Sequence, residues 1–373
     1  MNTKRVVDTF IELVKIDSEA KDEGQFQAFL KAKFESLELD VYEDDTIAQT
    51  GLGANNLLCT LKGEQDVAPI FFSAHVDTVA PGKGIKPQIR EEIIYSDGTT
   101  ILAADDKAGI AIMLELIEVI REEAIPHGTI EFVLTPGEEI GLVGANAFDM
   151  TKMTAKHGFV LDNGGPVGSI TMDSPTLMGL KVEVKGVTAH AGLEPEKGVS
   201  AIEIAAKAIS GMKLGRLDSE TTANIGTING GVASNIVADK VEVVAEARSI
   251  SQKKCQEQIN HMIEQFEIAS INLGGEINFS TDTKSVGYHF EKEDELVKQA
   301  AQAIAKVGRS VSYDSSGGGS DANVFNVNGR KALNLSIGYE KIHTTNEFLP
   351  INELMKAVEL SCELVNKFVK RTL

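Results

Sequence analysis

The stretch Pro69-Ile70-Phe71-Phe72-Ser73-Ala74 is a short apolar run that ends in His75-Val76-Asp77. An apolar run of this length with no alternating polar residues predicts a strand buried on both faces. Such strands belong to α/β sheets with helices on their faces, and ligands bind outside the carboxyl ends of the strands. We therefore expect His75 and Asp77 to lie at the ligand-binding edge of an α/β sheet.

Other apolar runs also end in residues that can carry chemistry. Asp105 follows residues 99–104, Glu138 and Glu139 follow 130–134, Asp162 follows 159–161, and His343 lies in the loop after 333–337. Each of these residues has an ordinary alternative when taken alone: a buried structural histidine, a helix N-cap, a solvated turn or a surface loop. Together they predict five strand ends that bring histidines and carboxylates to one rim.

This set of side chains indicates a cation site. Carboxylates that converge in one cleft repel each other and raise each other's pKa unless a cation neutralises them. Two imidazoles with carboxylates and no thiolate favour zinc, and manganese or cobalt fits the same ligands. More than four ligands predict two ions about 3.5–4 Å apart with a bridging carboxylate. In the adjacent pair Glu138-Glu139, one carboxylate can bind metal while the other acts as general base.

The order of predicted elements indicates one domain interrupted by another. In the outer segments, helices are predicted over 3–16, 25–37, 108–120 and 353–369, and strands over 56–61, 69–74, 129–134, 157–161 and 332–337. Beyond Ser174, strands over 179–186, 222–228, 240–250 and 275–281 and helices over 200–212 and 252–266 follow the β-α-β-β-α-β order of a ferredoxin-like fold. We predict a discontinuous catalytic domain, 1–173 and 284–373, and an inserted lid or dimerisation domain, 174–283.

Length and composition agree with this division and exclude several classes of protein. A chain of 373 residues predicts two domains, and 42% apolar with 24% charged residues is typical of globular proteins. The net charge of −19 argues against nucleic acid and anionic membranes as partners. No stretch approaches the ~20 apolar residues of a membrane span. Three widely separated cysteines, Cys59, Cys255 and Cys362, and the lack of a signal-peptide pattern favour a cytoplasmic protein with reduced thiols.

Five motifs, in order over nearly the whole chain, resemble those of the dinuclear zinc peptidases of the cocatalytic type. That family includes peptidase T, glutamate carboxypeptidases and aminoacylases. The motifs are Ser-Ala-His-Val-Asp-Thr-Val at 73–79, Ala-Asp-Asp-Lys-Ala-Gly at 104–109, Thr-Pro-Gly-Glu-Glu-Ile-Gly at 135–141, Leu161-Asp162, and Ile342-His343-Thr344. The second and third motifs are most similar to those of peptidase T.

The resemblance implies a phosphorylase/hydrolase-like catalytic domain with a mixed sheet, and a role for each motif residue. It implies that His75 binds one metal ion and that Asp77 orients His75. The resemblance further implies that Asp105 bridges the two ions and that its peptide bond to Asp106 is cis. It also implies that Glu138 is the general base and that the remaining ligands are Glu139, Asp162 and His343.

The inserted segment carries further matches. His190, within Gly-Val-Thr-Ala-His-Ala-Gly at 186–192, resembles the family's oxyanion-stabilising histidine, and the alternative is a surface residue. Asn235 and Arg248 resemble positions that contact the substrate carboxylate or carbonyl, and a surface salt bridge is the alternative for Arg248. Peptidase T has an arginine where this chain has Gly317, which leaves tripeptide recognition open. Gly318 and Gly319 can still present backbone N–H groups to an anionic substrate group.

The sequence thus predicts an enzyme that uses two divalent metal ions, zinc first, to hydrolyse small peptides. Release of the N-terminal residue from a tripeptide is the leading prediction. An N-acyl amino acid deacylase or a carboxypeptidase of the same family is an alternative, and a non-catalytic peptide-binding protein is a further one. Asp77 and Glu138 argue against the binding protein, which needs no general base. A homodimer formed through the inserted domain is a further expectation.

Overall fold

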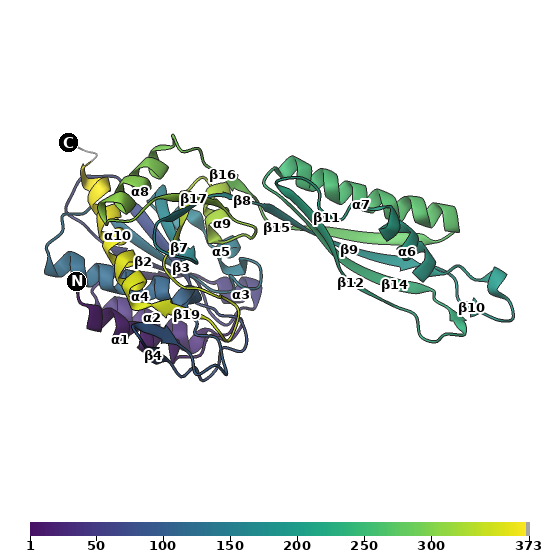
Figure 1. Ribbon diagram of the computed structural model, residues 1–373, viewed down its shortest axis with the longest axis horizontal. Helices are drawn as coiled ribbons and strands as arrows, with labels where there is room; N and C mark the ends of the chain where they lie inside the picture. Colours follow the sequence, from purple (N-terminus) through teal and green to yellow (C-terminus); the bar gives the residue numbers. More distant parts are fainter. Residues whose placement is uncertain (371–373) are drawn as a thin grey trace. The chain divides into compact units, whose positions relative to one another are not determined.

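The computed structural model describes residues 1–370, which divide into two compact units (Figure 1). Unit 1 contains Met1–Met172, Phe290–Ser316 and the described residues from Ser320 onward, and unit 2 contains Asp173–His289 and Gly317–Gly319. The main segment of unit 2 therefore runs from Asp173 to His289, whereas the sequence predicts the bounds 174 and 283. Its role as a lid or dimerisation domain stays a prediction.

Unit 1 is a layered α/β structure around a mixed sheet. Its elements are α1 (Thr3–Val14), α2 (Gly24–Ser36), β1 (Asp40–Glu43), α3 (Thr46–Thr50), β2 (Leu57–Leu61), β3 (Ile70–His75), β4 (Gln88–Arg90), β5 (Ile93–Tyr95), α4 (Ala104–Glu122), β6 (Ile130–Thr135), α5 (Val143–Ala147), the 3-10 helix η1 (Met150–Lys152), β7 (His157–Asn163), β8 (Ser169–Ser174), which ends in unit 2, α8 (Glu295–Lys306), β17 (Ser312–Ser315), α9 (Asp321–Val327), β18 (Lys331–Ser336), β19 (Phe348–Pro350) and α10 (Ile351–Lys370). The sheet runs β1-β2-β6-β3-β7-β18-β8, and its four middle strands, β6, β3, β7 and β18, are mutually parallel. The expected mixed sheet is confirmed.

The apolar run that predicts β3 forms the centre of this sheet. All six residues of β3 are buried. Phe72 lies in register with Phe132 of β6 and Phe159 of β7, with ring centroids 6.1 and 5.7 Å away. Helix α4 packs against β3 and β7, and α1 and α10 pack against α4. Truncation of a phenylalanine in such a core costs about 3–5 kcal/mol of stability, so Phe72→Ala would weaken the frame of the site.

The parallel middle strands bring their carboxyl ends to one edge of the sheet. His75 ends β3, Glu138 follows β6, Asp162 lies near the end of β7, and His343 follows β18. The prediction that Asp105 also follows a strand is wrong, since residues 99–103 are irregular and Asp105 lies in the first turn of α4. The N–H groups of this loop bond to a side-chain carboxylate instead of a neighbouring strand.

The two α-helices and the four ten-residue strands of unit 2 follow the expected β-α-β-β-α-β order. Its elements are β9 (Thr176–Lys185), β10 (Ala189–His190), the 3-10 helix η2 (Pro195–Lys197), α6 (Ala201–Gly211), β11 (Gly215–Arg216), β12 (Thr221–Gly230), β13 (Ile236–Val237), β14 (Lys240–Ser249), α7 (Gln252–Leu273), β15 (Glu276–Ser285) and β16 (Tyr288–His289). The antiparallel sheet β11-β12-β14-β9-β15 buries alternate residues of β9, such as Val182 and Val184, in one core with Ile204 of α6 and Phe266 of α7. The alternation in the sequence therefore marks a sheet with one face packed on helices.

None of the helices within residues 1–370 combines the length and the apolar character that crossing a membrane requires.

Candidate active site

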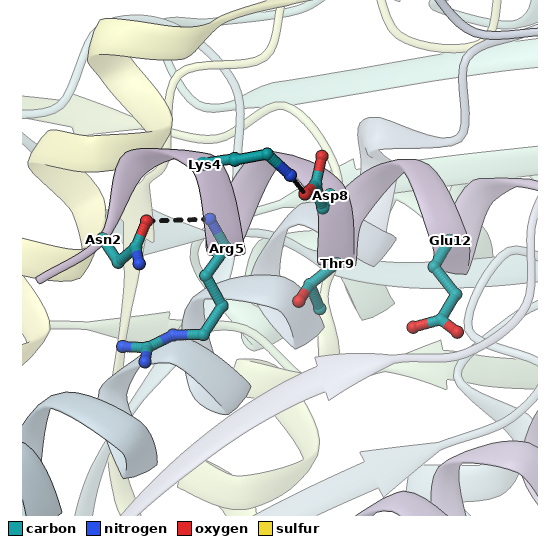
Figure 2. Close-up of a pocket in the computed structure, with 6 residues that line it drawn as sticks. All are labelled: Asn2, Lys4, Arg5, Asp8, Thr9 and Glu12. Carbon is teal, nitrogen blue, oxygen red and sulfur yellow. Dashed lines mark hydrogen bonds and ion pairs between the residues drawn. The ribbon is translucent and has the colours of Figure 1, made fainter.

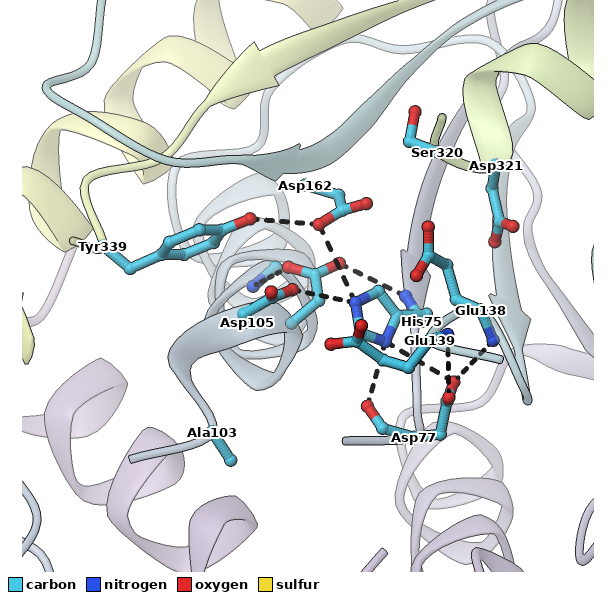
Figure 3. A network of polar contacts seen from close by, with 12 residues as sticks. His75, Asp77, Ala103, Asp105, Glu138, Glu139, Asp162, Ser320, Asp321 and Tyr339 are labelled. Carbon is cyan, nitrogen blue, oxygen red and sulfur yellow. Dashed lines mark hydrogen bonds and ion pairs between the residues drawn. The ribbon is translucent and has the colours of Figure 1, made fainter. Parts of the chain in front are cut away.

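His75 is held in a defined orientation at the end of β3. It is buried, and its Nδ1 lies 2.9 Å from the backbone oxygen of Asp77 and 3.5 Å from that residue's carboxylate. Its Nε2 lies 2.9 Å from Asp105 Oδ1 and 3.7 Å from Asp162 Oδ1. A neutral imidazole that donates through Nδ1 aims its unshared pair at two carboxylates. A cation between these groups would satisfy all three (Figure 3).

Asp105 lies between two imidazoles. Its Oδ1 faces His75, and its Oδ2 is 3.2 Å from His343 Nε2. His343 Nε2 is also 2.9 Å from Glu139 Oε1. Within residues 1–370, three sets of potential ligands have atoms within 4.8 Å of one another: His75, Asp105 and Asp162; Asp105, Glu139 and His343; and His75, Glu138 and Glu139. The first two sets share Asp105, which is the arrangement that two bridged ions need.

Burial and mutual repulsion strongly perturb the carboxylates. Burial raises the pKa of Glu138 and of Asp162 well above the usual range, and neighbouring carboxylates add to the effect. Burial also opposes ionisation of Asp105, but hydrogen bonds from His343 and His75 outweigh it and hold the Asp105 pKa below its usual value. Hydrogen bonds to Asp105 and Glu139 raise the His343 pKa to about 10. The protein alone thus holds extra protons here, which a bound cation would displace.

The buried carboxylate of Asp77 organises the turn that follows β6. Its Oδ1 accepts a hydrogen bond from the backbone N–H of Glu138 at 2.9 Å, and its Oδ2 accepts one from Glu139 at 3.1 Å. The turn needs Gly137, since its φ is +67° and a Cβ there would lie 2.7 Å from Leu52. Asp77 therefore orients His75 and both glutamates together.

The Ala104–Gly109 motif is anchored from two sides. The Asp105–Asp106 peptide bond is cis, as the resemblance implies, and Asp106 Oδ2 accepts a hydrogen bond from the backbone N–H of His75 at 3.2 Å. Lys107 is buried, and its Nζ donates to the backbone oxygens of Ile16 at 2.6 Å and Leu13 at 3.3 Å. Burial lowers the Lys107 pKa to about 7. The lysine thus joins the start of α4 to the end of α1.

Three further residues, which the sequence did not predict, lie beside the cluster of potential ligands formed by His75, Asp105, Glu138, Glu139, Asp162 and His343. Tyr339 donates its hydroxyl hydrogen bond to Asp162 Oδ1 at 3.0 Å, and Asp321 accepts one from Thr135. Glu347 accepts hydrogen bonds from backbone N–H groups on both sides of Ala104. Their signal in the sequence is weak, because Tyr339 and Glu347 lie in loops and Asp321 is the first residue of α9, and only the folded chain brings them to the cluster.

Unit 2 brings two predicted residues close together: His190 lies on a strand, and Asn235 directly precedes the strand that pairs with it. His190 lies on β10, which pairs with β13, and the backbone oxygen of Asn235 accepts a hydrogen bond from Ala191 at 2.9 Å. His190 Nδ1 accepts hydrogen bonds from the N–H groups of Gly192 and Leu193 at 3.1 and 3.2 Å. The neutral imidazole therefore carries its proton on Nε2, where it can donate.

Arg248 contacts the segment Gly317–Gly319, which also belongs to unit 2. Its Nη1 donates to the backbone oxygen of Gly317 at 3.0 Å, and its Nε pairs with Glu246 at 2.8 Å. The salt bridge that was the alternative prediction for Arg248 is thus present, with Glu246 as the partner. The backbone oxygen of Gly318 accepts a hydrogen bond from Ser174 at 2.8 Å, and a side chain at Gly317 or Gly318 would meet no atom within 4 Å. Gly317 is therefore not required by packing.

A separate pocket lies along α1 and has a different character (Figure 2). It is lined by Asn2, Lys4, Arg5, Asp8, Thr9 and Glu12. Its cations are paired, Lys4 with Asp8 and Arg5 with Glu115, and Asn2 accepts a hydrogen bond from the backbone of Arg5. Among the described residues, none of the groups with the spacing of metal ligands includes a residue of this pocket.

The family model described as "Peptidase family M20/M25/M40" matches residues 71–367, which include every residue of the cluster. The chain belongs to peptidase family M20/M25/M40. Membership confirms the expectation of a hydrolase of the metallopeptidase class, whereas the roles of individual residues stay predictions.

Solved structures and curated relatives similar to this M20-family chain include close matches over the full length. Aminopeptidase PepT from Bacillus cereus ATCC 10987 is 51% identical with a TM-score of 0.94, and the match covers 99% of both chains. A tripeptidase from Staphylococcus aureus subsp. aureus Mu50 is 45% identical with a TM-score of 0.96, covering 100% of this chain and 99% of that one. "Uncharacterized protein YqjE" of Bacillus subtilis (strain 168) is 49% identical over 99% of this chain and 100% of its own length.

Proposed function

We propose that this protein is a dinuclear metal-dependent aminopeptidase that releases the N-terminal residue from tripeptides. The observation that carries the proposal is the position of Asp105, whose two carboxylate oxygens face the imidazoles of His75 and His343. The similarity to an aminopeptidase and a tripeptidase at 45–51% identity over nearly the full chain supports this substrate class.

The residues present fit a pair of divalent ions. His75 and Asp162 would hold one ion, Glu139 and His343 the other, and Asp105 both. Imidazole nitrogens and carboxylate oxygens without a thiolate suit zinc first, with cobalt and manganese as further candidates. Burial with few neutralising cations explains why the protein needs ions here, because the Glu138 and Asp162 carboxylates would otherwise hold protons. Two bound ions would polarise the scissile carbonyl and lower the pKa of the attacking water.

Glu138 is the general base of the proposed reaction. It takes a proton from the attacking water and delivers that proton to the nitrogen of the leaving amine. Asp77 holds the Glu138 backbone in place, so that the carboxylate faces the cluster rather than solvent. Such proton transfer contributes about 10²–10⁴-fold to rates, so Glu138→Gln should lower kcat by that factor without loss of zinc.

Unit 2 supplies the proposed substrate contacts. His190 donates through Nε2 to the oxyanion of the tetrahedral intermediate, a role that its tautomer supports. Arg248, with Asn235, recognises the peptide's C-terminal carboxylate or a carbonyl, since guanidinium pairs bidentately with carboxylates. Gly318 and Gly319 offer backbone N–H groups to the same anionic group.

The compartment and the assembly belong to the same proposal. The three cysteines, Cys59, Cys255 and Cys362, are free thiols, which supports a reducing, cytoplasmic location. Exposed apolar side chains on unit 2, among them Leu193 and Val232 at 76% and 83% exposure, support a homodimer formed through this unit.

A panel of peptides tests the proposal. Tri-, di- and tetrapeptides with free or acetylated N-termini, together with N-acyl amino acids, are incubated with the zinc-loaded enzyme, with chelator, and with Glu138→Gln. We expect release of the N-terminal residue from free tripeptides, loss with chelator, and little turnover of acetylated peptides. Cleavage confined to N-acyl amino acids would instead identify a deacylase, release of the C-terminal residue a carboxypeptidase, and peptide binding without turnover a binding protein.

A further inference from the structure

Glu347 is a buried carboxylate that touches the backbone of the cluster rather than its side chains. Its side chain is 1% exposed. Its Oε2 accepts hydrogen bonds from the N–H groups of Leu102 at 2.7 Å and Ala103 at 2.9 Å, and its Oε1 accepts one from Asp105 at 3.0 Å. We propose that Glu347 is a positioning residue of the metal centre, which sets the place of Asp105 by binding the backbone before it. The inference rests on the metal centre proposed above.

The loop that Glu347 binds has no regular structure to hold it. Residues 99–103 lie outside helices and strands, and Ala103 has a φ of +61° in the left-handed region, which L-residues rarely adopt. Ala103 is labelled in Figure 3, directly before the turn that carries Asp105. Backbone N–H groups that are buried need acceptors, and here one ionisable side chain serves three of them. The direction of the Asp105 side chain therefore depends on Glu347.

Glu347 also belongs to the loop that presents His343. Within this loop, Thr344 Oγ1 donates to the backbone oxygen of Lys341 at 2.7 Å, and the Glu347 N–H donates to the backbone oxygen of Thr344 at 3.2 Å. The next residue begins β19, which pairs with β5. The segment 343–347 therefore contacts Asp105 twice. His343 lies against one side-chain oxygen of Asp105, and the Glu347 carboxylate accepts a hydrogen bond from the Asp105 backbone. This double contact couples the two loops that meet at the predicted bridging ligand.

The chain offers a matched control in Glu131 of β6. Glu131 is also buried, at 2% exposure, and accepts hydrogen bonds from the N–H groups of Thr154 at 2.8 Å and Ala155 at 3.0 Å. It lies at the start of β6, whereas Glu138 follows the other end. A merely structural carboxylate would behave like Glu131, so the pair separates stability from positioning.

Zinc affinity tests the proposal independently of turnover. Wild type, Glu347→Gln, Glu347→Asp and Glu131→Gln are stripped of metal, and zinc binding is measured by competition with a chromophoric chelator, alongside thermal unfolding of the metal-free proteins. Substitution of groups that orient metal ligands typically costs about 10–100-fold in affinity. For Glu347→Gln we expect a loss of zinc affinity of this size at the weaker of the two ion sites, and for Glu347→Asp a smaller loss at the same site. Glu131→Gln should bind zinc with wild-type affinity. Excess zinc should restore kcat of Glu347→Gln at an unchanged KM.

The outcomes separate this inference from the proposed function. Two tightly bound ions in both wild type and Glu347→Gln would overturn the positioning role and leave the proposed function intact. An equal loss in Glu131→Gln would assign the effect to general destabilisation and also overturn it. A wild-type protein that binds no zinc would overturn the proposed centre itself. Should Glu347→Gln not fold, the charge-preserving Glu347→Asp decides by the same comparison.

Discussion

His343 Nε2 lies 3.2 Å from Asp105 Oδ2, so an imidazole from the C-terminal part of the chain meets a carboxylate at the start of α4. The other oxygen of that carboxylate faces His75 at 2.9 Å. Each imidazole thus has its own oxygen, and neither competes with the other. A carboxylate in this position can be shared by two cations without moving.

Removal of His343 should cost one ion of the pair. We expect His343→Ala to bind one zinc ion tightly instead of two, because the second ion would keep only carboxylate ligands. Loss of a direct ligand should exceed the effect of losing an outer partner, so kcat/KM should fall by at least about 100-fold. Metal analysis after dialysis checks the stoichiometry. His127→Ala, outside the cluster, serves as the control, and an unchanged metal content in His343→Ala would remove His343 from the ligand set.

Asp77→Asn should disturb the turn after β6. The two carboxylate oxygens of Asp77 accept hydrogen bonds from the backbone N–H groups of Glu138 and Glu139. An asparagine keeps one of these oxygens, and its NH₂ group, which is a donor, faces the other N–H group. We expect zinc affinity and kcat to fall by about 10–100-fold. Asp149→Asn is the control, because Asp149 caps an exposed helix and its carboxylate also accepts a hydrogen bond from a backbone N–H group. Equal, small effects in both variants would contradict an orienting role for Asp77.

The metal-free protein should lose stability as pH rises from about 5 to 7. Burial raises the pKa of Asp321 to about 6 and of Glu347 to about 7, and it raises the pKa of Glu138 and Asp162 as well. In the unfolded chain these groups return to ordinary values near 4. The folded state therefore binds more protons in this range, and the free energy of unfolding falls with rising pH.

Excess zinc should reverse this slope, because the ligands must lose their protons to bind metal. Urea unfolding at several pH values, with chelator and with zinc, measures both slopes. Parallel pH profiles in the two conditions would mean that the cluster does not bind the ion.

Arg248→Ala should affect only peptides that carry a free C-terminal carboxylate. The guanidinium is held by Glu246 and by the backbone oxygen of Gly317, which leaves one of its terminal amino groups for a substrate anion. Hydrogen bonds to charged groups contribute about 1.5–3 kcal/mol, so KM for free tripeptides should rise by about tenfold or more. Steady-state kinetics with free and C-terminally amidated tripeptides check this. A similar increase for both substrates would assign Arg248 a structural role.

Much of the fold could be predicted, because its central strands are locally encoded. Phe71 and Phe72 lie in an apolar run too short for a helix, and the alternation around Val182 and Val184 marks a half-exposed sheet. His75 ends such a strand and reaches the site through the parallel topology, whereas Glu138 follows β6 in a turn that Asp77 also holds.

Asp105 shows where local pattern was insufficient. Its apolar approach, 99–104, resembles a strand, yet the Glu347 carboxylate captures the N–H groups that a neighbouring strand would have used. Glu347 and Tyr339 could not be predicted because each lies in a loop whose path depends on contacts distant in sequence. Asp321, the first residue of α9, reaches Thr135 only in the folded chain. Nothing in their local pattern distinguishes them from turn residues.

The most direct test is the position of the metal ions in crystals of the zinc-loaded protein, measured by anomalous diffraction at the zinc absorption edge. We predict two peaks, each about 2.0–2.2 Å from a different oxygen of Asp105, one beside His75 and the other beside His343. A single peak, or two peaks that do not share Asp105, would contradict the bridged centre on which the proposed peptidase activity depends.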